Sequence, residues 1–126
     1  MAYVGLVTLM MLVQYLVFIM LVGKQRVAHQ IKAPATSGHE LFDRAYRIQM
    51  NTLEQMAIAL PAMWVCAWFF KPGVAAILGL VFVAGRFFYG LSYMADPEKR
   101  GPGMAVGFLS YLGMIGCGLW GIVAGL

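Results

Sequence analysis

Long apolar blocks alternate with short polar segments along this chain. Residues 2–23, 74–95 and 104–126 are each dominated by apolar residues and long enough for one bilayer crossing. A further block, from Leu41 to Phe70, begins polar and becomes apolar in its second half. The pattern predicts four transmembrane helices with short links. It therefore indicates an all-α, up-down four-helix membrane bundle that forms one domain over residues 1–126.

The three connections between these blocks contain residues that interrupt helices. The first, residues 24–41, is the longest polar stretch and includes Pro34 and Gly38. Lys71-Pro72-Gly73 predicts a tight turn between the second and third helices. Residues 96–103 combine charged residues with prolines and glycines and predict the last turn.

A few residues inside the apolar blocks indicate how the helices meet. Gln14 is the one strongly polar residue of the first block, and we expect it to face another helix. Gly121 and Gly125 have the small-xxx-small spacing that lets helix backbones approach closely. Pro61 removes the amide that would bond to the carbonyl of Ala57, which predicts a kink in the second helix.

The composition agrees with a membrane protein and excludes several other classes. Hydrophobic residues make up 62% of the chain and charged residues 11%, whereas a soluble domain carries about 25% charged residues. Cys66 and Cys117 lie in apolar blocks and are expected to be small buried hydrophobes, without a disulfide framework or a metal site. His29 and His39 fall in the polar stretch, where we expect them to be solvated. No basic arm suggests nucleic acid as a partner.

The basic residues predict the orientation in the membrane. The first and third connections, with the start of the second helix, hold six of the nine lysines and arginines: Lys24, Arg26, Lys32, Arg44, Lys99 and Arg100. The second connection holds only Lys71. By the positive-inside rule, both termini lie outside and the two basic connections lie in the cytoplasm.

Two stripes of polar residues suggest a binding site near the cytoplasmic side. At about 100° per residue, Asn51 and Glu54 both fall within roughly 40° of Arg47 on one helix face. Arg86, Tyr89 and Tyr93 form a second stripe in the third block. Ionisable groups in a membrane are costly and are usually paired or functional. An ion pair between Arg86 and Glu54 is the simplest arrangement. It leaves an excess of donors, which is typical of a site for a polyanionic ligand.

These residues carry a family resemblance. The pattern D-R-A-Y-R-x-Q-x-N-x-x-E (Asp43 to Glu54), the pattern G-R-x-x-Y-x-x-x-Y (Gly85 to Tyr93) and Lys99-Arg100 resemble the MAPEG family. Its members are membrane-associated proteins in eicosanoid and glutathione metabolism. The resemblance covers nearly the whole chain and implies a homotrimer with glutathione sites between neighbouring subunits. Glutathione would be the co-substrate.

The same resemblance implies roles for individual residues. Arg100 would be catalytic, because a guanidinium beside the glutathione sulfur favours the thiolate. The remaining residues would bind glutathione: Arg47, Asn51, Glu54, Arg86, Tyr89 and Tyr93, with Gln49 reaching the site of the adjacent subunit and Arg26 matching a first-loop arginine after a one-residue gap. Gln55 departs from the tyrosine of the leukotriene-C synthase branch. Asp96 and Glu98 place two acids before Arg100, which could weaken thiolate activation.

The implied activity is that of a microsomal-type glutathione S-transferase. Its thiolate would attack lipophilic electrophiles that arrive from the membrane lipid, in a detoxification reaction. Reduction of lipid hydroperoxides would be a second activity, because it uses the same thiolate and the same access from the membrane. Two other classes stay open. One is a non-catalytic membrane scaffold or lipid-binding protein of the same family. The other is a small ion-conducting or transport bundle, which the lack of an inverted repeat disfavours.

Overall fold

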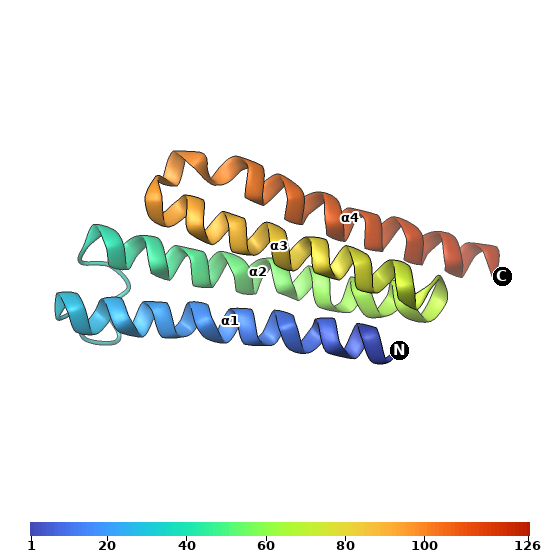
Figure 1. Ribbon diagram of the computed structural model, residues 1–126, viewed down its shortest axis with the longest axis horizontal. Coiled ribbons are helices and arrows are strands. Elements are labelled where there is room, and N and C mark those ends of the chain that lie inside the picture. The colour runs from blue at the N-terminus through green and yellow to red at the C-terminus, as the bar shows by residue number, and fades with distance from the viewer.

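Four long helices lie side by side in the computed structural model, which describes residues 1–126 (Figure 1). They are α1 (Ala2–His29), α2 (Glu40–Phe69), α3 (Pro72–Ala95) and α4 (Gly101–Ala124), with a short 3₁₀ helix, η1 (Pro97–Arg100), before α4. Both termini lie at one end of the bundle, and the first and third connections lie at the other end (Figure 1). The predicted all-α up-down bundle is confirmed.

Three of the helical segments, α1, α3 and Pro97–Ala124, are long and apolar enough to cross a membrane. α2 is not among them, because its first half is polar, and its crossing of the membrane stays a prediction. That half carries Glu40, Asp43, Arg44, Arg47 and Glu54. α2 nevertheless runs along the bundle in contact with all three other long helices (Figure 1).

Several helix boundaries differ from the prediction for local reasons. α1 continues to His29, beyond the apolar block, and ends where Gln30 adopts the left-handed conformation with φ 55°. Pro72 lies in the first turn of α3 and Pro102 in the first turn of α4, not in turns between helices. A proline is compatible with a helix start, because the amide it lacks has no partner there.

Small residues let the helices approach closely. A Cβ atom on Gly103 would lie 2.7 Å from the backbone nitrogen of Tyr89, so α3 and α4 touch backbone to backbone at this point. Gly121 lies against the backbone carbonyl of Phe69, as the small-xxx-small spacing predicted, whereas Gly125 meets only its own helix. Gln14 faces α3, as predicted, and its Nε2 donates to the carbonyl of Val83 at 2.9 Å.

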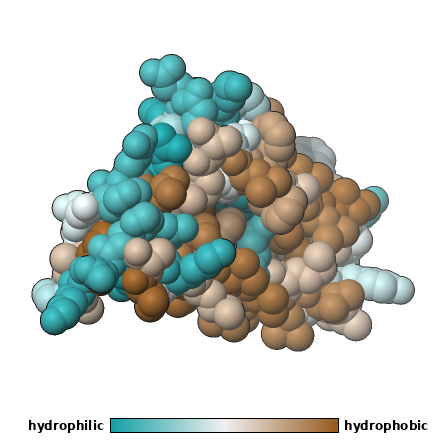
Figure 2. Space-filling view, turned by 60° about the vertical axis from the view of Figure 1, so that its left-hand side comes forward, coloured by the Kyte–Doolittle hydropathy of each residue, from teal (hydrophilic) through white to brown (hydrophobic).

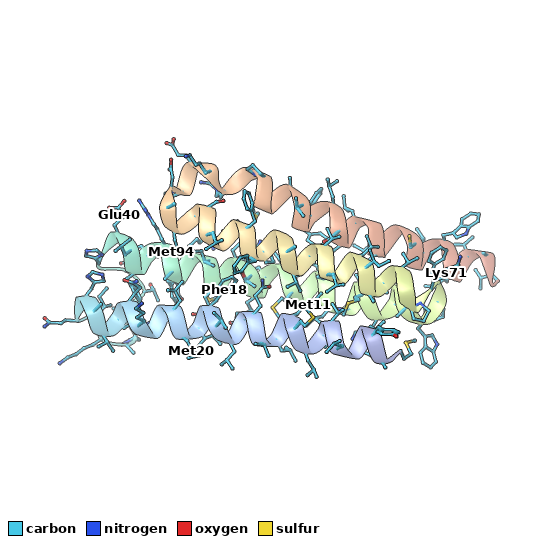
Figure 3. The ribbon with its side chains drawn as sticks, in the orientation of Figure 1. Met11, Phe18, Met20, Glu40, Lys71 and Met94 are labelled. Atoms are coloured by element: carbon cyan, nitrogen blue, oxygen red, sulfur yellow. The ribbon has the colours of Figure 1, made fainter.

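The flanks and the ends of the bundle differ in polarity. Hydrophilic residues gather at the end formed by the first and third connections, which comes forward in Figure 2. Along α1, Met11 points into the bundle, while Met20 points outward from the flank (Figure 3). Large apolar side chains exposed along all four helices would be unfavourable in water but suit lipid. The protein is therefore an integral membrane protein.

The cysteines lie in the apolar part of the bundle, and the histidines lie at its polar end. Cys66 is buried and Cys117 half-buried, and no disulfide joins them. His39 is exposed, but its ring stacks on that of His29, with centroids 3.5 Å apart. Its Nδ1 accepts from the backbone N–H of Leu41 and so caps the start of α2. The expected solvated position is confirmed for His39, while the ring stacking and the cap were not predicted.

Candidate functional site

Arg86 is the centre of the polar cluster inside the bundle. Its side chain is only 1% exposed, and its Nη2 donates to Asn51 Oδ1 at 2.8 Å and to Thr52 Oγ1 at 2.9 Å. The guanidinium carbon lies 4.0 Å from the ring centroid of Tyr89, three residues further along α3. Two helices therefore fix the guanidinium, α2 through hydrogen bonds and α3 through the aromatic ring.

The other nitrogens of Arg86 have weak partners or none. Nη1 donates to the thioether sulfur of Met104 at 3.4 Å, and thioethers are weak acceptors. Nε is buried and has no hydrogen-bond partner in the protein. No carboxylate pairs with Arg86, since the salt bridges of the chain are Arg44–Glu40 and Arg47–Glu54. A buried cation with free donors and no counterion is suited to an anionic ligand.

The predicted ion pair between Arg86 and Glu54 was wrong. Glu54 Oε1 instead accepts from Arg47 Nη1 at 3.3 Å, within α2. The two residues are seven positions apart, which brings them back to the same helix face after two turns. Both side chains are about half exposed, at 53% and 57%. The pair is accessible from outside the chain, whereas Arg86 and Asn51 are buried.

Aromatic rings form one wall of the cluster. The rings of Tyr89 and Tyr93 have centroids 5.6 Å apart. Tyr89 is buried and packs with Phe18 of α1 and Ile48 of α2, while Tyr93 is half-buried beside them. The close approach of Gly103 holds the backbone at Tyr89 in place. The predicted stripe of Arg86, Tyr89 and Tyr93 therefore forms one wall, in which the Tyr89 ring contacts the Arg86 guanidinium.

Three predicted site residues bond elsewhere in the chain. Gln49 Nε2 donates to the hydroxyl of Tyr15 at 3.4 Å, on the side of α2 away from Arg47. Arg26 donates to the carbonyl of Ala35 at 2.8 Å and lies over the ring of Phe42, so it orders the first connection. Arg100 is exposed and donates to the carbonyl of Pro97 at 3.0 Å, within η1. A single chain does not bring these three to Arg86.

The acidic residues near Arg100 do not pair with it. Asp96 Oδ1 accepts from the backbone N–H of Glu98 at 3.1 Å and thereby caps η1. Glu98 is exposed. Gln55, which stands where the leukotriene-C synthase branch has a tyrosine, accepts a hydrogen bond from the hydroxyl of Tyr111 at 2.7 Å. Its side chain therefore links α2 to α4 within one chain.

Two residues of the cluster were missed by the sequence analysis. Thr52 offered one signal, a hydroxyl next to Asn51 at the start of an apolar segment, but no role was predicted for it. Met104 gave no signal, since a methionine in an apolar block is ordinary. Only the contact between helices reveals that its sulfur meets Arg86.

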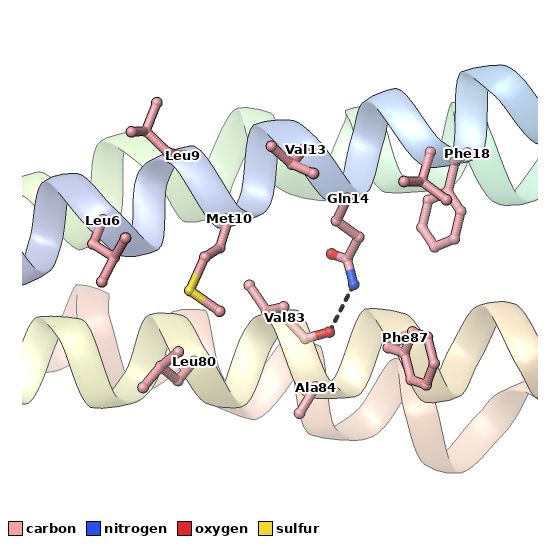
Figure 4. A pocket seen from close by; sticks show the side chains of 11 residues that line it. Leu6, Leu9, Met10, Val13, Gln14, Phe18, Leu80, Val83, Ala84 and Phe87 are labelled. Atoms are coloured by element: carbon pink, nitrogen blue, oxygen red, sulfur yellow. Dashed lines mark hydrogen bonds between the residues drawn. The ribbon is translucent and has the colours of Figure 1, made fainter.

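An apolar groove of about 840 Å³ lies between α1 and α3 (Figure 4). Hydrophobic side chains form ten of its eleven lining residues, and Gln14 is the polar one. The groove follows a different face of α3 from Arg86. Phe18 joins the two regions, because it lines one end of the groove and also packs against Tyr89.

Comparisons with known proteins agree with these observations. The MAPEG family model matches residues 4–120. The uncharacterised protein sll1147 of Synechocystis is 43% identical over 106 residues, which are 84% of this chain and 77% of that protein. Human microsomal glutathione S-transferase 2 is 34% identical over 101 residues, 79% of this chain and 69% of the human protein. Guinea-pig leukotriene C4 synthase is 33% identical over 99 residues, 79% of this chain and 66% of that enzyme. The four-helix membrane bundle with its buried Arg86 cluster therefore belongs to the MAPEG family.

Proposed function

We propose that this protein is a membrane-bound glutathione transferase that conjugates glutathione to lipophilic electrophiles. The observation that carries the proposal is Arg86, a buried cation with no carboxylate partner. Its Nη1 has only the thioether sulfur of Met104 as an acceptor, and its Nε has no acceptor. Relatives named as a glutathione S-transferase and as a leukotriene C4 synthase support the same chemistry.

The carboxylates, the ammonium group and the peptide carbonyls of glutathione each match a side chain of the Arg86 cluster or of the exposed Arg47–Glu54 pair. Its carboxylates are acceptors for the free N–H groups of Arg86 and for Arg47. The carboxylate of Glu54 is suited to the ammonium group of the tripeptide. Asn51 has used its oxygen on Arg86 and keeps its amide N–H groups for a peptide carbonyl. Tyr89 and Tyr93 supply the aromatic wall.

We further propose that the active protein is a homotrimer with its sites between subunits. Arg47 and Glu54 are half exposed, and Gln49 lies on the other side of α2, where it would exchange its bond to Tyr15 for a contact with the ligand of the neighbouring subunit. Arg100 and Arg26 bond outside the Arg86 cluster in the single chain. Residues from two chains would therefore complete each site.

Arg100 would be the catalytic residue. Its guanidinium is exposed at the polar end of α4, with one nitrogen bonded within η1. Placed beside the glutathione sulfur, it would favour the thiolate over the thiol. The sulfur then forms a bond to an electrophilic carbon and gives a thioether. The bond from that carbon to its leaving group breaks, or an epoxide C–O bond opens, and the departing atom takes the electron pair. The thiol proton leaves to water. With a lipid hydroperoxide, two glutathiones would give the disulfide, the lipid alcohol and one water.

Each substrate would reach the site from a different side. We propose that the basic connections and the site face the cytoplasm, where glutathione is found, and that both termini lie outside. The lipophilic electrophile would enter laterally from the bilayer. The groove between α1 and α3 supports this entry, because it is apolar and ends at Phe18 beside Tyr89.

The mechanism predicts a thiolate signal that depends on Arg100. Glutathione added to the purified protein should produce ultraviolet thiolate absorbance at neutral pH. Arg100→Ala should bind glutathione with similar affinity but lose most of the absorbance and about 100-fold or more of the conjugation rate. Lys99→Ala, next to it and also exposed, is the matched control. Bound glutathione without thiolate absorbance in the unchanged protein would disprove this mechanism.

A non-catalytic lipid-binding scaffold is the second candidate, and the groove is the observation that favours it. A scaffold would bind a lipid probe in the groove but show no turnover. Purified protein that binds glutathione, yet converts none of several electrophiles and lipid hydroperoxides, would favour the scaffold over the transferase.

A further inference from the structure

Thr52 is a polar residue of the cluster that the glutathione-binding set does not include. It is completely buried, and its hydroxyl oxygen lies 2.9 Å from Arg86 Nη2. It lies directly after Asn51 on α2, so two consecutive short side chains contact one nitrogen of a residue on another helix.

The hydrogen atoms of the guanidinium determine what this arrangement leaves free. Nη2 carries two hydrogens, and Asn51 and Thr52 provide one acceptor for each. Nη2 is therefore fully bonded to α2. The hydrogens on Nη1 and Nε remain for a ligand, since Nη1 meets only the Met104 sulfur and Nε has no partner.

Thr52 is also the stiffer of the two acceptors. Its branched side chain has few rotamers in a helix, whereas an asparagine amide can turn about its last torsion. The Tyr89 ring lies 4.0 Å from the guanidinium carbon, and a contact of this kind does not by itself fix the rotation of the guanidinium about its own axis. A second hydrogen bond to Nη2 removes that freedom.

We propose that Thr52 is a positioning residue for Arg86, one that holds the guanidinium so that Nη1 and Nε face bound glutathione. This inference rests on the proposed function. A purely structural Thr52 would stabilise the fold by satisfying a buried cation, and its loss would lower thermal stability without a selective effect on glutathione. A positioning Thr52 affects ground-state binding of glutathione more than the chemical step, because Arg100 acts on the sulfur.

The test compares Thr52→Val, which keeps the shape and removes the acceptor, with Thr52→Ser, which keeps the hydroxyl. We expect Thr52→Val to raise the Kd and KM for glutathione about tenfold, the effect of losing one hydrogen bond to a charged group. The kcat at saturating glutathione and the thiolate absorbance of the saturated protein should change less than about twofold. Thr52→Ser should restore the affinity to within about twofold of the unchanged protein.

Two further variants serve as a control and as a substitute for Thr52→Val. Thr8→Val removes another intramembrane hydroxyl, one that bonds to Trp64 and the Val4 carbonyl, and should leave glutathione affinity unchanged. If Thr52→Val does not fold, Thr52→Cys offers a weaker acceptor of similar size and should show an intermediate loss of affinity. Unchanged affinity in Thr52→Val or Thr52→Cys, or equal losses in the valine and serine variants, would overturn the assignment. Failure of the unchanged protein to bind glutathione would instead refute the proposed function, and the assignment with it.

Discussion

The two halves of the bundle are held together by different means. Toward the termini, the core is made of apolar side chains, many of them alanine and methionine, in close contact, as around Met63, Cys66 and Gly79. Toward the basic connections, hydrogen bonds and a ring surround the Arg86 guanidinium. In the apolar half, every buried side-chain nitrogen and oxygen has a hydrogen-bond partner. The polar half keeps N–H groups without matching acceptors, which is why we assign the ligand to that half.

The difference has a physical basis in the membrane environment. Van der Waals contact between small residues satisfies an apolar interface without polar groups, so no unmatched donor or acceptor remains there for a polar ligand. A buried guanidinium offers five N–H donors in a fixed plane, and two short acceptors from α2 use only two of them. The unmatched donors make this half less stable than it would be with apolar residues, and more useful for recognition.

The largest expected effect follows from removing the cation. Arg86→Met should abolish detectable glutathione binding, a loss of at least about 100-fold, because the central donors disappear. The melting temperature should stay the same or rise, since an uncompensated buried charge is replaced by an apolar side chain. Isothermal titration and thermal unfolding in detergent measure the two effects. Lys71→Met, at the opposite end of the bundle, is the control. A clear fall in melting temperature would show that Arg86 is needed to hold the polar half together.

One added methyl group in each half of the bundle tests whether stability and glutathione binding can be changed separately. Gly103→Ala places a Cβ against the Tyr89 backbone, and Gly121→Ala places one against the Phe69 carbonyl. Each should destabilise the protein by about 1–3 kcal/mol through overpacking. Only Gly103→Ala should also weaken glutathione binding, because it displaces Tyr89.

Two neighbouring glycines provide matched controls for this pair. Gly101→Ala and Gly116→Ala lie on the same helix in open surroundings, and neither should change stability through contact. Thermal unfolding and glutathione titration of all four variants give the comparison. Equal loss of glutathione affinity in Gly103→Ala and Gly121→Ala would mean that the two halves are not independent.

The smallest expected effect on stability comes from breaking the half-exposed ion pair between Arg47 and Glu54. Arg47→Gln breaks the contact with Glu54 but should change the free energy of unfolding by less than about 1 kcal/mol, since both side chains are half exposed. Glutathione binding should weaken about tenfold, because a charged contact to the ligand is lost. Chemical unfolding and titration separate these two outcomes. Unchanged glutathione affinity would remove Arg47 from the site.

The positions of the helices and of the polar stripes could be predicted from the sequence because both are local properties. Hydropathy identified the apolar blocks, and helical spacing placed Arg47 and Glu54 on one face. The same spacing placed Gln49 on the far side of α2. Gln14 was identified as an interhelical contact, since a lone amide in an apolar block needs a partner.

The tertiary structure alone decided which groups meet between helices. Arg86 could be placed on a face of α3, but its partners depend on how far α2 is shifted along the bundle. That shift brings Asn51 and Thr52 to the guanidinium and leaves Glu54 to Arg47. Met104 joins the cluster only because Gly103 allows α4 to touch α3 at Tyr89. Helix periodicity fixes rotation about one axis, and the packing of small residues fixes the depth at which neighbouring helices meet.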